Sequence, residues 1–174
     1  SWTQVQESAA SHGTGGEPYF LMDKYTLRRQ LKAARNALKP AERRHAARAS
    51  LRLAMRHGLL LRARRIGFYL PQGGEFDAHP LLNQALMMQR ECYLPVLPRR
   101  GRMMRFGRLG RSTRMTTNRY GIPEPLDLKP LRARQLDLLF MPLVGFDQRG
   151  YRLGMGGGYY DATLAFMQHR CLWR

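Results

Sequence analysis

Short apolar segments alternate with helical segments along this chain, and this alternation is the feature that most constrains its fold. Residues 24–38 carry an apolar residue every three or four positions, and Pro40 suits the first turn of a second helix that Gly58 can cap. A third helix is expected after Asp77, whose side chain can serve as the N-cap. Short apolar runs, which are expected to form buried strands, occupy residues 65–71, 92–98, 103–109 and 136–142.

This order of elements predicts an α/β fold. Strands that are connected by helices pair in parallel through right-handed crossovers, and the helices cover the sheet. We therefore expect a single three-layer α/β/α domain with a mainly parallel sheet, in which ligands bind at the carboxyl ends of the strands. The chain has 174 residues, which is enough for one such domain. Residues 1–22 are polar and are expected to form a disordered arm, which leaves residues 23–174 for the domain.

Cysteine spacing and hydropathy narrow the cellular setting. Cys92 and Cys171 are far apart and lack the spacing of a disulfide framework or a zinc site, so we expect reduced thiols and a cytoplasmic protein. No apolar run approaches the roughly 20 residues that a membrane helix needs. We therefore expect no membrane partner.

The chain is strongly basic, with 30 Lys and Arg residues against 12 Asp and Glu residues and a net charge of +18. Such a charge attracts polyanions, but arginines scattered over every segment equally fit a solvated surface of no specific function. A basic nucleic-acid-binding protein is therefore an alternative. The sequence carries no RNA-recognition aromatic signature, KH loop, zinc spacing or helix-turn-helix core, so nucleic acid is not the expected partner.

The segment RLGMGGGYYD, residues 152–161, places three consecutive glycines between an extended segment and a helical pattern. Glycines at such a position let backbone N–H groups converge on an anion, and the next helix adds the positive end of its dipole. A turn that needs positive φ is the other interpretation, and it accounts for one or two of the glycines. The segment fits neither common nucleotide motif. Tyr159 stands where the dinucleotide fingerprint needs glycine, and no lysine follows Lys129 to complete a P-loop.

A phosphate at these glycines would need cations and, for a nucleotide, a metal ion. The cations could come from Arg149 or Arg152 beside the glycines, or from Lys24 and Arg28 one helical turn apart on the first helix. Asp161, in the first helical turn after the glycines, is the natural oxygen ligand for a Mg²⁺ ion that bridges phosphates. Its alternative role is to complement the helix dipole.

Residues 145–161, GFDQRGYRLGMGGGYYD, resemble the signature of the 5-formyltetrahydrofolate cyclo-ligase family, also called the 5,10-methenyltetrahydrofolate synthetases. Three further segments agree in order and spacing: KYTLRRQLKAARNAL, IGFYLPQGGEFD and YGIPEP. The similarity runs from about Lys24 to the end of the chain. It implies an enzyme that uses ATP and Mg²⁺ to close 5-formyltetrahydrofolate to 5,10-methenyltetrahydrofolate, with release of ADP and phosphate. That reaction needs no protein nucleophile, so no catalytic Ser or Cys is expected.

The resemblance also implies roles for individual residues. The implied ATP-binding residues are Lys24, Arg28, Arg152, Leu153, Gly154, Met155, Gly156, Gly157, Gly158, Tyr159 and Tyr160. The implied folate-binding residues are Leu70, Glu75, Tyr120, Met155, Gly156, Gly157, Gly158 and Tyr159. Asp161 matches a magnesium ligand. Glu75 can accept hydrogen bonds from the amino and ring N–H groups of the pterin, and Tyr120 can stack on the pterin.

Two departures from the family pattern are visible. Some members carry a lysine where this chain has Gly157, which leaves more of the positive charge to Arg152 and Lys24. The family also continues for some tens of residues beyond the helix after the glycines, adding strands and a second acidic metal ligand. The domain at residues 23–174 is therefore expected to lack that C-terminal segment. A catalytically inert α/β scaffold is a further alternative to the expected monomeric enzyme.

Overall fold

A computed structural model describes residues 23–167, so the expected arm at residues 1–22 and the end of the chain at residues 168–174 lie outside the described residues. The central sheet has the strand order β3-β2-β1-β6. Its strands are β1 (Arg65–Gly67), β2 (Glu91–Val96), β3 (Arg105–Leu109) and β6 (Leu138–Leu139). Strand β1 pairs in parallel with β2 and with β6, while β3 pairs antiparallel with β2. The α/β fold with a mostly parallel sheet is therefore confirmed, and the three-layer arrangement stays a prediction.

The helices begin and end close to the predicted positions. The described helices are α2 (Lys24–Ala37), α3 (Pro40–Arg56), α4 (Leu59–Arg62), α5 (His79–Met87) and α6 (Tyr159–Thr163), with 3₁₀ turns η1 (Ala133–Gln135) and η2 (Ala165–Met167). Pro40 opens α3, and Gly58 follows that helix in the left-handed conformation with a φ of 66°, as predicted. The predicted cap of α5 is wrong by one residue. Ala78 is the N-cap, because Asp77 forms a turn before the helix and accepts the N–H of His79 at 3.0 Å. None of the helices in residues 23–167 is long and apolar enough to cross a membrane.

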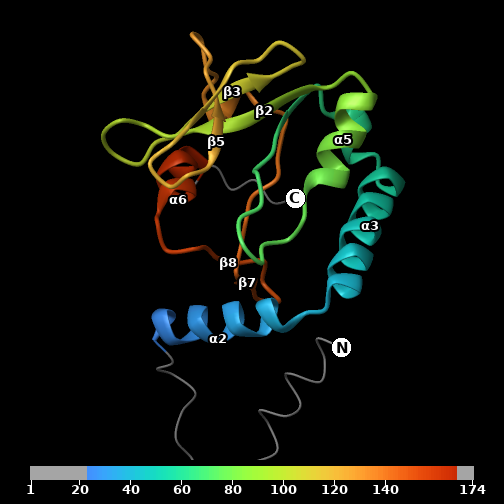
Figure 1. Ribbon diagram of the computed structural model, residues 1–174, viewed down its shortest axis with the longest axis vertical. Helices are drawn as coiled ribbons and strands as arrows, with labels where there is room; N and C mark the ends of the chain where they lie inside the picture. The colour runs from blue at the N-terminus through green and yellow to red at the C-terminus, as the bar shows by residue number, and fades with distance from the viewer. Residues whose placement is uncertain (1–22, 168–174) are drawn as a thin grey trace, which may run out of the picture.

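The hydrophobic core lies between the sheet and the helices α3 and α5. Leu60, Ile66 and Phe68 are fully buried there, and the Phe68 ring stacks on Phe140 with the ring centroids 5.1 Å apart. Figure 1 shows α3 and α5 side by side along one side of the sheet, and α5 packs against β2. Full burial of one such side chain contributes about 1.5–3 kcal/mol, so this core is a major source of hydrophobic stabilisation.

The strands predicted at residues 65–71 and 136–142 are shorter in the structure. Strands β1 and β6 have three and two residues, and one further backbone bond follows, from the N–H of Phe140 to the carbonyl of Gly67 at 2.9 Å. Beyond this point both segments leave the sheet and run toward α2 (Figure 1). The loops after two neighbouring parallel strands therefore approach the same helix.

Two antiparallel hairpins were not predicted. Strand β4 (Met115–Thr117) pairs with β5 (Pro123–Pro125), and β7 (Gly145–Phe146) pairs with β8 (Arg152–Leu153). The second hairpin lies between β6 and the glycines in the chain. The glycine segment therefore directly follows β8, and not the parallel strand β6. Leu31 of α2 packs closely against Gly145 of β7. A Cβ atom added at Gly145 would lie only 2.7 Å from the Cδ1 of Leu31. Figure 1 shows both strands of the hairpin beside α2.

Candidate functional site

The glycine loop, residues 154–158, joins β8 to the short helix α6. Gly156 and Gly158 have φ values of 104° and 69°, a region that side chains rarely adopt, and Gly158 is the N-cap of α6. Gly157 has no such requirement, but a Cβ atom there would lie 3.0 Å from the Cδ2 of Tyr159. Backbone conformation therefore explains two of the three consecutive glycines. Gly157 is the one whose missing side chain leaves room beside an aromatic ring.

Helix α2 supplies two guanidinium groups to the glycine loop. The Nε of Arg28 donates a hydrogen bond to the carbonyl of Gly154 at 2.9 Å, and the Nη1 of Arg35 contacts the Sδ of Met155 at 3.9 Å. Lys24 is exposed in the first turn of the same helix. Arg149, the other cation considered from the sequence, lies in the hairpin turn before β8. The first helix and the glycine segment, which are more than a hundred residues apart in sequence, thus lie against each other.

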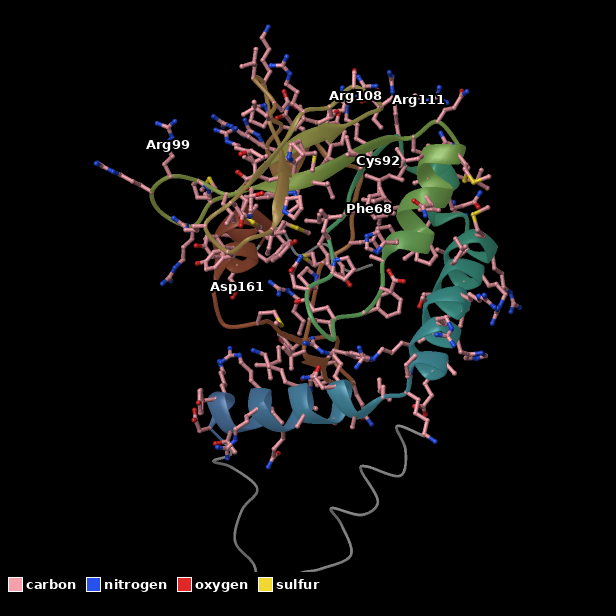
Figure 2. All side chains as sticks on the ribbon, in the orientation of Figure 1. Phe68, Cys92, Arg99, Arg108, Arg111 and Asp161 are labelled. Atoms are coloured by element: carbon pink, nitrogen blue, oxygen red, sulfur yellow. The ribbon has the colours of Figure 1, made fainter. Side chains whose placement is uncertain are left out.

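Arg152 and Asp161, which were predicted to bind ATP and the metal ion, are partners of each other. The Nη2 of Arg152 donates to the Oδ1 of Asp161 at 2.6 Å, and the same guanidinium lies 5.8 Å from the centroid of the Tyr160 ring. Figure 2 shows Asp161 on the side of α6 toward α2. The Asp161 side chain is 73% exposed, so its second oxygen remains accessible to solvent and to a ligand.

A resident metal site is not formed by the described part of the chain. Within residues 23–167, no group of three or more His, Cys, Asp or Glu side chains could hold a metal ion. Mg²⁺ is commonly held by one or two carboxylates together with phosphate oxygens and water. A single exposed carboxylate at the glycine loop therefore fits a Mg²⁺ ion that arrives with a nucleotide, and it does not fit an ion held by the protein alone.

Two tyrosines that were predicted to contact the folate meet at the other side of the glycine loop. The hydroxyl oxygens of Tyr120 and Tyr159 are 2.9 Å apart, and their rings meet edge to face at a centroid distance of 6.1 Å. The Nη2 of Arg119 donates to the Tyr159 hydroxyl at 2.6 Å. The hydrogen bond from Tyr120, together with the bond and the charge of Arg119, lowers the pKa of Tyr159. This arrangement fixes the ring of Tyr159 next to Gly157.

Glu75 and Leu70, the remaining predicted folate contacts, follow β1. The Oε2 of Glu75 accepts the N–H of Gln72 at 3.0 Å and closes a tight turn. Burial, followed by the negative charge of Glu75, raises the pKa of Tyr69 and that of Tyr160. The charge of the Glu75 carboxylate therefore reaches both Tyr69, which follows β1, and Tyr160 of α6. Leu70 packs against the hydrophobic core.

Three arginines at the glycine loop were missed by the sequence analysis: Arg35, Arg102 and Arg119. Arg102 approaches the end of the loop, since a Cβ atom at Gly158 would lie 3.6 Å from its Cδ. The signal for Arg35 was available, because it follows Arg28 by seven residues and so shares its face of the helix. No local pattern distinguishes Arg102 from the other arginines.

Two hollows elsewhere on the protein are not lined by any of the predicted site residues. One is a groove of about 790 Å³ beside β3, lined by basic residues such as Arg108 and Lys129, and the other is a space of about 580 Å³ beside α3. The size of a hollow does not identify the chemistry here. The convergence of α2, the loop after β1 and the glycine loop is the better guide to the site.

The fold and the site together define a mixed α/β protein with a glycine-rich loop that is flanked by arginines and tyrosines. Comparisons with known proteins specify this class further. Residues 21–172 match the model of the 5-formyltetrahydrofolate cyclo-ligase family. The chain therefore belongs to that family.

Individual relatives agree with this assignment. The chain is 35% identical over 142 residues to the 5-formyltetrahydrofolate cyclo-ligase of Escherichia coli K12, covering 80% of this chain and 78% of that relative. It is 41% identical over 111 residues to the Haemophilus influenzae enzyme of the same name, covering 62% of this chain and 59% of that relative. The structure also superimposes on the 5,10-methenyltetrahydrofolate synthetase of Aquifex aeolicus with a TM-score of 0.70 and 28% identity, covering 82% of this chain and 72% of the other.

Proposed function

We propose that this protein converts 5-formyltetrahydrofolate to 5,10-methenyltetrahydrofolate with ATP, releasing ADP and phosphate. Membership of the cyclo-ligase family supports the proposal. The structural observation that carries it is the hydrogen bond from Arg28 of α2 to Gly154, which joins the first helix to the glycine loop. Both segments were assigned to the nucleotide by resemblance, and this contact supports the proposal that they form one site.

The reaction makes a poor electrophile reactive. Nitrogen donates electrons into the formyl carbonyl, so the amide carbon resists attack. When the γ-phosphorus of ATP bonds to the formyl oxygen, its bond to the β,γ-bridging oxygen breaks and ADP leaves. The formyl group is now an iminium phosphate, and N10 attacks its carbon. The carbon–oxygen bond breaks, phosphate departs, and the N10 proton is transferred to it. The protein must mainly position the substrates and neutralise charge.

In this proposal the glycine loop, Arg28 and Arg152 bind the phosphates of ATP, with Lys24 at the start of α2 as a further cation. The backbone N–H groups around Gly156 and Gly157 supply directional donors, and the guanidinium groups supply charge. Arg152 donates to Asp161 through Nη2, so its other N–H groups remain for a phosphate.

The folate side of the proposed site comprises Leu70, Glu75, Tyr120 and Tyr159. Glu75 would accept hydrogen bonds from the pterin, and the edge-to-face pair of Tyr120 and Tyr159 offers aromatic surface for stacking. Leu153, Gly154, Met155, Gly158 and Tyr160 complete the proposed loop contacts, where the two substrates would meet.

Mg²⁺ is part of the proposal through one residue. Asp161 would hold the ion together with phosphate oxygens, and the ion would offset the negative charge of the phosphates. The second oxygen of Asp161, which is not bonded to Arg152, would be the one available for this purpose. A second acidic ligand is not needed for an ion that the nucleotide brings.

A cytoplasmic monomer completes the proposal. Cys92 is buried in the core, and burial raises the pKa of its thiol to about 11, so the thiol is kept protonated and unreactive. Light scattering of the purified protein would report the mass of the particle, and a mass twice that of the chain would contradict the monomer.

The deciding experiment follows the ultraviolet absorbance of the methenyl product with and without ATP. We expect product only with ATP and 5-formyltetrahydrofolate together. Glu75→Gln should raise the KM for the folate and leave the affinity for ATP nearly unchanged, because the substitution removes one charge on the folate side. The absence of ATP-dependent product from the folded protein would refute the proposed function. Equal losses for both substrates in the variant would refute the role of Glu75.

A further inference from the structure

Arg35 is a half-buried cation that has no anionic partner among residues 23–167. Its Nη1 lies 3.9 Å from the Sδ of Met155, and sulfur is a weak acceptor. Its Nε is buried and has no hydrogen-bond partner among residues 23–167. No carboxylate in the same part of the chain lies within 4.0 Å of the guanidinium. A buried N–H group without a partner costs free energy, so its retention calls for an explanation such as a ligand.

Other arginines share one of these features but not all of them. Arg43 and Arg65 also have a buried Nε without a partner. The Nη2 of Arg43 donates to the carbonyls of Arg35 and Asn36, and Arg65 lies 3.5 Å from the carboxylate of Glu91. Arg90 is the remaining case, and it lines the groove beside β3, away from the glycines. Within residues 23–167, Arg35 is thus the arginine at the glycine loop whose Nε is buried and has no partner.

The position of Arg35 lies between the two proposed substrate regions. On one side it touches Met155 of the glycine loop. On the other side its charge acts on Tyr69, whose pKa is raised first by burial and then by Glu75, and is lowered in part by Arg35. The next residue on α2, Asn36, lies against Gly74 in the turn that Glu75 closes.

We propose that Arg35 binds the γ-phosphoryl group of ATP while this group passes to the formyl oxygen. The inference rests on the proposed function. The glycine loop is the proposed phosphate site and Glu75 the proposed folate contact, and the γ-phosphoryl group is the part of ATP that must lie between them. A guanidinium offers several N–H donors in one plane and neutralises the charge on the oxygens of the transferred group.

The test compares Arg35→Ala, Arg35→Lys and the control Arg29→Ala in the full chain. Alanine favours the helix, and it keeps the backbone carbonyl that accepts bonds from Leu38 and Arg43. Arg29 is an exposed residue of the same helix. Its replacement by alanine removes one positive charge, as Arg35→Ala does. We expect Arg35→Ala to lower kcat about 100-fold or more. The lysine variant should recover part of the rate, and Arg29→Ala should keep it.

Nucleotide binding distinguishes this role from general support of the loop. By calorimetry, Arg35→Ala should bind ADP as the unsubstituted protein does and should bind ATP more weakly, because only ATP carries the γ-phosphoryl group. An unchanged kcat in Arg35→Ala, or equal losses of ADP and ATP affinity, would overturn the proposal.

Three further outcomes are decisive. If circular dichroism shows that Arg35→Ala is unfolded, the lysine variant carries the test, and full activity with lysine combined with weaker binding of ADP overturns the proposal. If the unsubstituted protein makes no product from ATP and folate, the proposed function fails and this inference fails with it. If the unsubstituted protein is active and Arg35→Ala is equally active, only the role of Arg35 is refuted.

Discussion

The sheet and its helices are held together by different forces from those that hold α2 to the glycine loop. Leu60, Ile66 and Phe68 are fully buried beneath α3 and α5, whereas α2 has no buried residue at all. Helix α2 contacts the rest of the protein through the bond from Arg28 to Gly154, the packing of Leu31 on β7, and contacts at its C-terminal end (Figure 1). A polar ligand cannot replace the contacts of a buried apolar side chain. It can replace a carbonyl group as the acceptor of a hydrogen bond from an arginine. We therefore expect the first region, the sheet region, to carry most of the stability, and we place the proposed binding in the second, the region of α2 and the glycine loop.

The largest effect on stability is expected from Phe68→Ala. This ring is fully buried and stacks on Phe140, so its removal leaves a cavity that should cost about 3–5 kcal/mol of the free energy of unfolding. Domains of this size are often stable by only about 5–15 kcal/mol. Urea denaturation measures the loss. The control is Phe146→Ala on β7, whose ring is 75% exposed and whose removal should change stability by no more than about 0.5 kcal/mol. Equal losses for the two variants would contradict the division into two regions.

Gly157→Val should have the opposite effect to Phe68→Ala: we expect normal stability and little activity. A Cβ atom at Gly157 would lie 3.0 Å from the ring of Tyr159, so the ring or the loop must shift by a few tenths of an ångström. Small displacements of bound substrates can lower turnover by roughly 100-fold, and we expect a loss of about that size with unchanged far-UV circular dichroism. Gly110→Val is the control, since a Cβ atom there would make only an ordinary contact at 3.6 Å from Thr113. Normal turnover in Gly157→Val would mean that the glycines serve chain geometry alone.

The first region could be predicted from the sequence more completely than the second. Apolar runs, Pro40 and Gly58 act through local rules, and the structure confirms the helices and strands that they indicate, with shorter strands. The β7–β8 hairpin was missed because each of its strands has two residues, too few to show a period of two. The pairs between Arg28 and Gly154, and between Arg119 and Tyr159, join residues distant in sequence. No local pattern encodes such pairs. The resemblance to a family assigned Arg28 and the glycine segment to the same ligand, but it gave no role to Arg119.

Within the second region, Arg152 and Asp161 should have separable roles. Arg152→Ala should weaken ATP binding by about 1.5–3 kcal/mol, the range for a charge-assisted hydrogen bond. Asp161→Asn should instead raise the Mg²⁺ concentration that activity requires, because it removes the carboxylate that the ion would share with phosphates. Calorimetry with ATP and activity assays over a Mg²⁺ series measure the two effects. An unchanged Mg²⁺ dependence in Asp161→Asn would leave the carboxylate as the ion-pair partner of Arg152 and as a complement to the dipole of α6.

The smallest effect should come from an electrostatic contact in the first region, where β1 begins. The Oδ2 of Asp137 accepts the backbone N–H groups of Arg65 and Arg64 at 2.8 and 2.9 Å, and these bonds, that of Arg65 first, lower the pKa of the carboxyl group. Asp137→Ala should cost about 1 kcal/mol at neutral pH, because the side chain is exposed and water screens the bonds.

The pH dependence of Asp137→Ala has a definite sign. Because the pKa is lower in the folded protein, the charged carboxylate stabilises the fold fully above the unfolded pKa of about 3.9, and this contribution is lost as the pH falls through the lowered value. The stability difference between the unsubstituted protein and Asp137→Ala, measured by urea denaturation, should therefore be constant from neutral pH to about pH 5 and shrink below pH 4. Asp137→Asn keeps one acceptor oxygen and should retain part of the stability without this pH dependence. A difference that grew on acidification would show that the charge of Asp137 does not stabilise the folded state. A cost above that of Phe68→Ala would show that charge, and not apolar burial, dominates the sheet region.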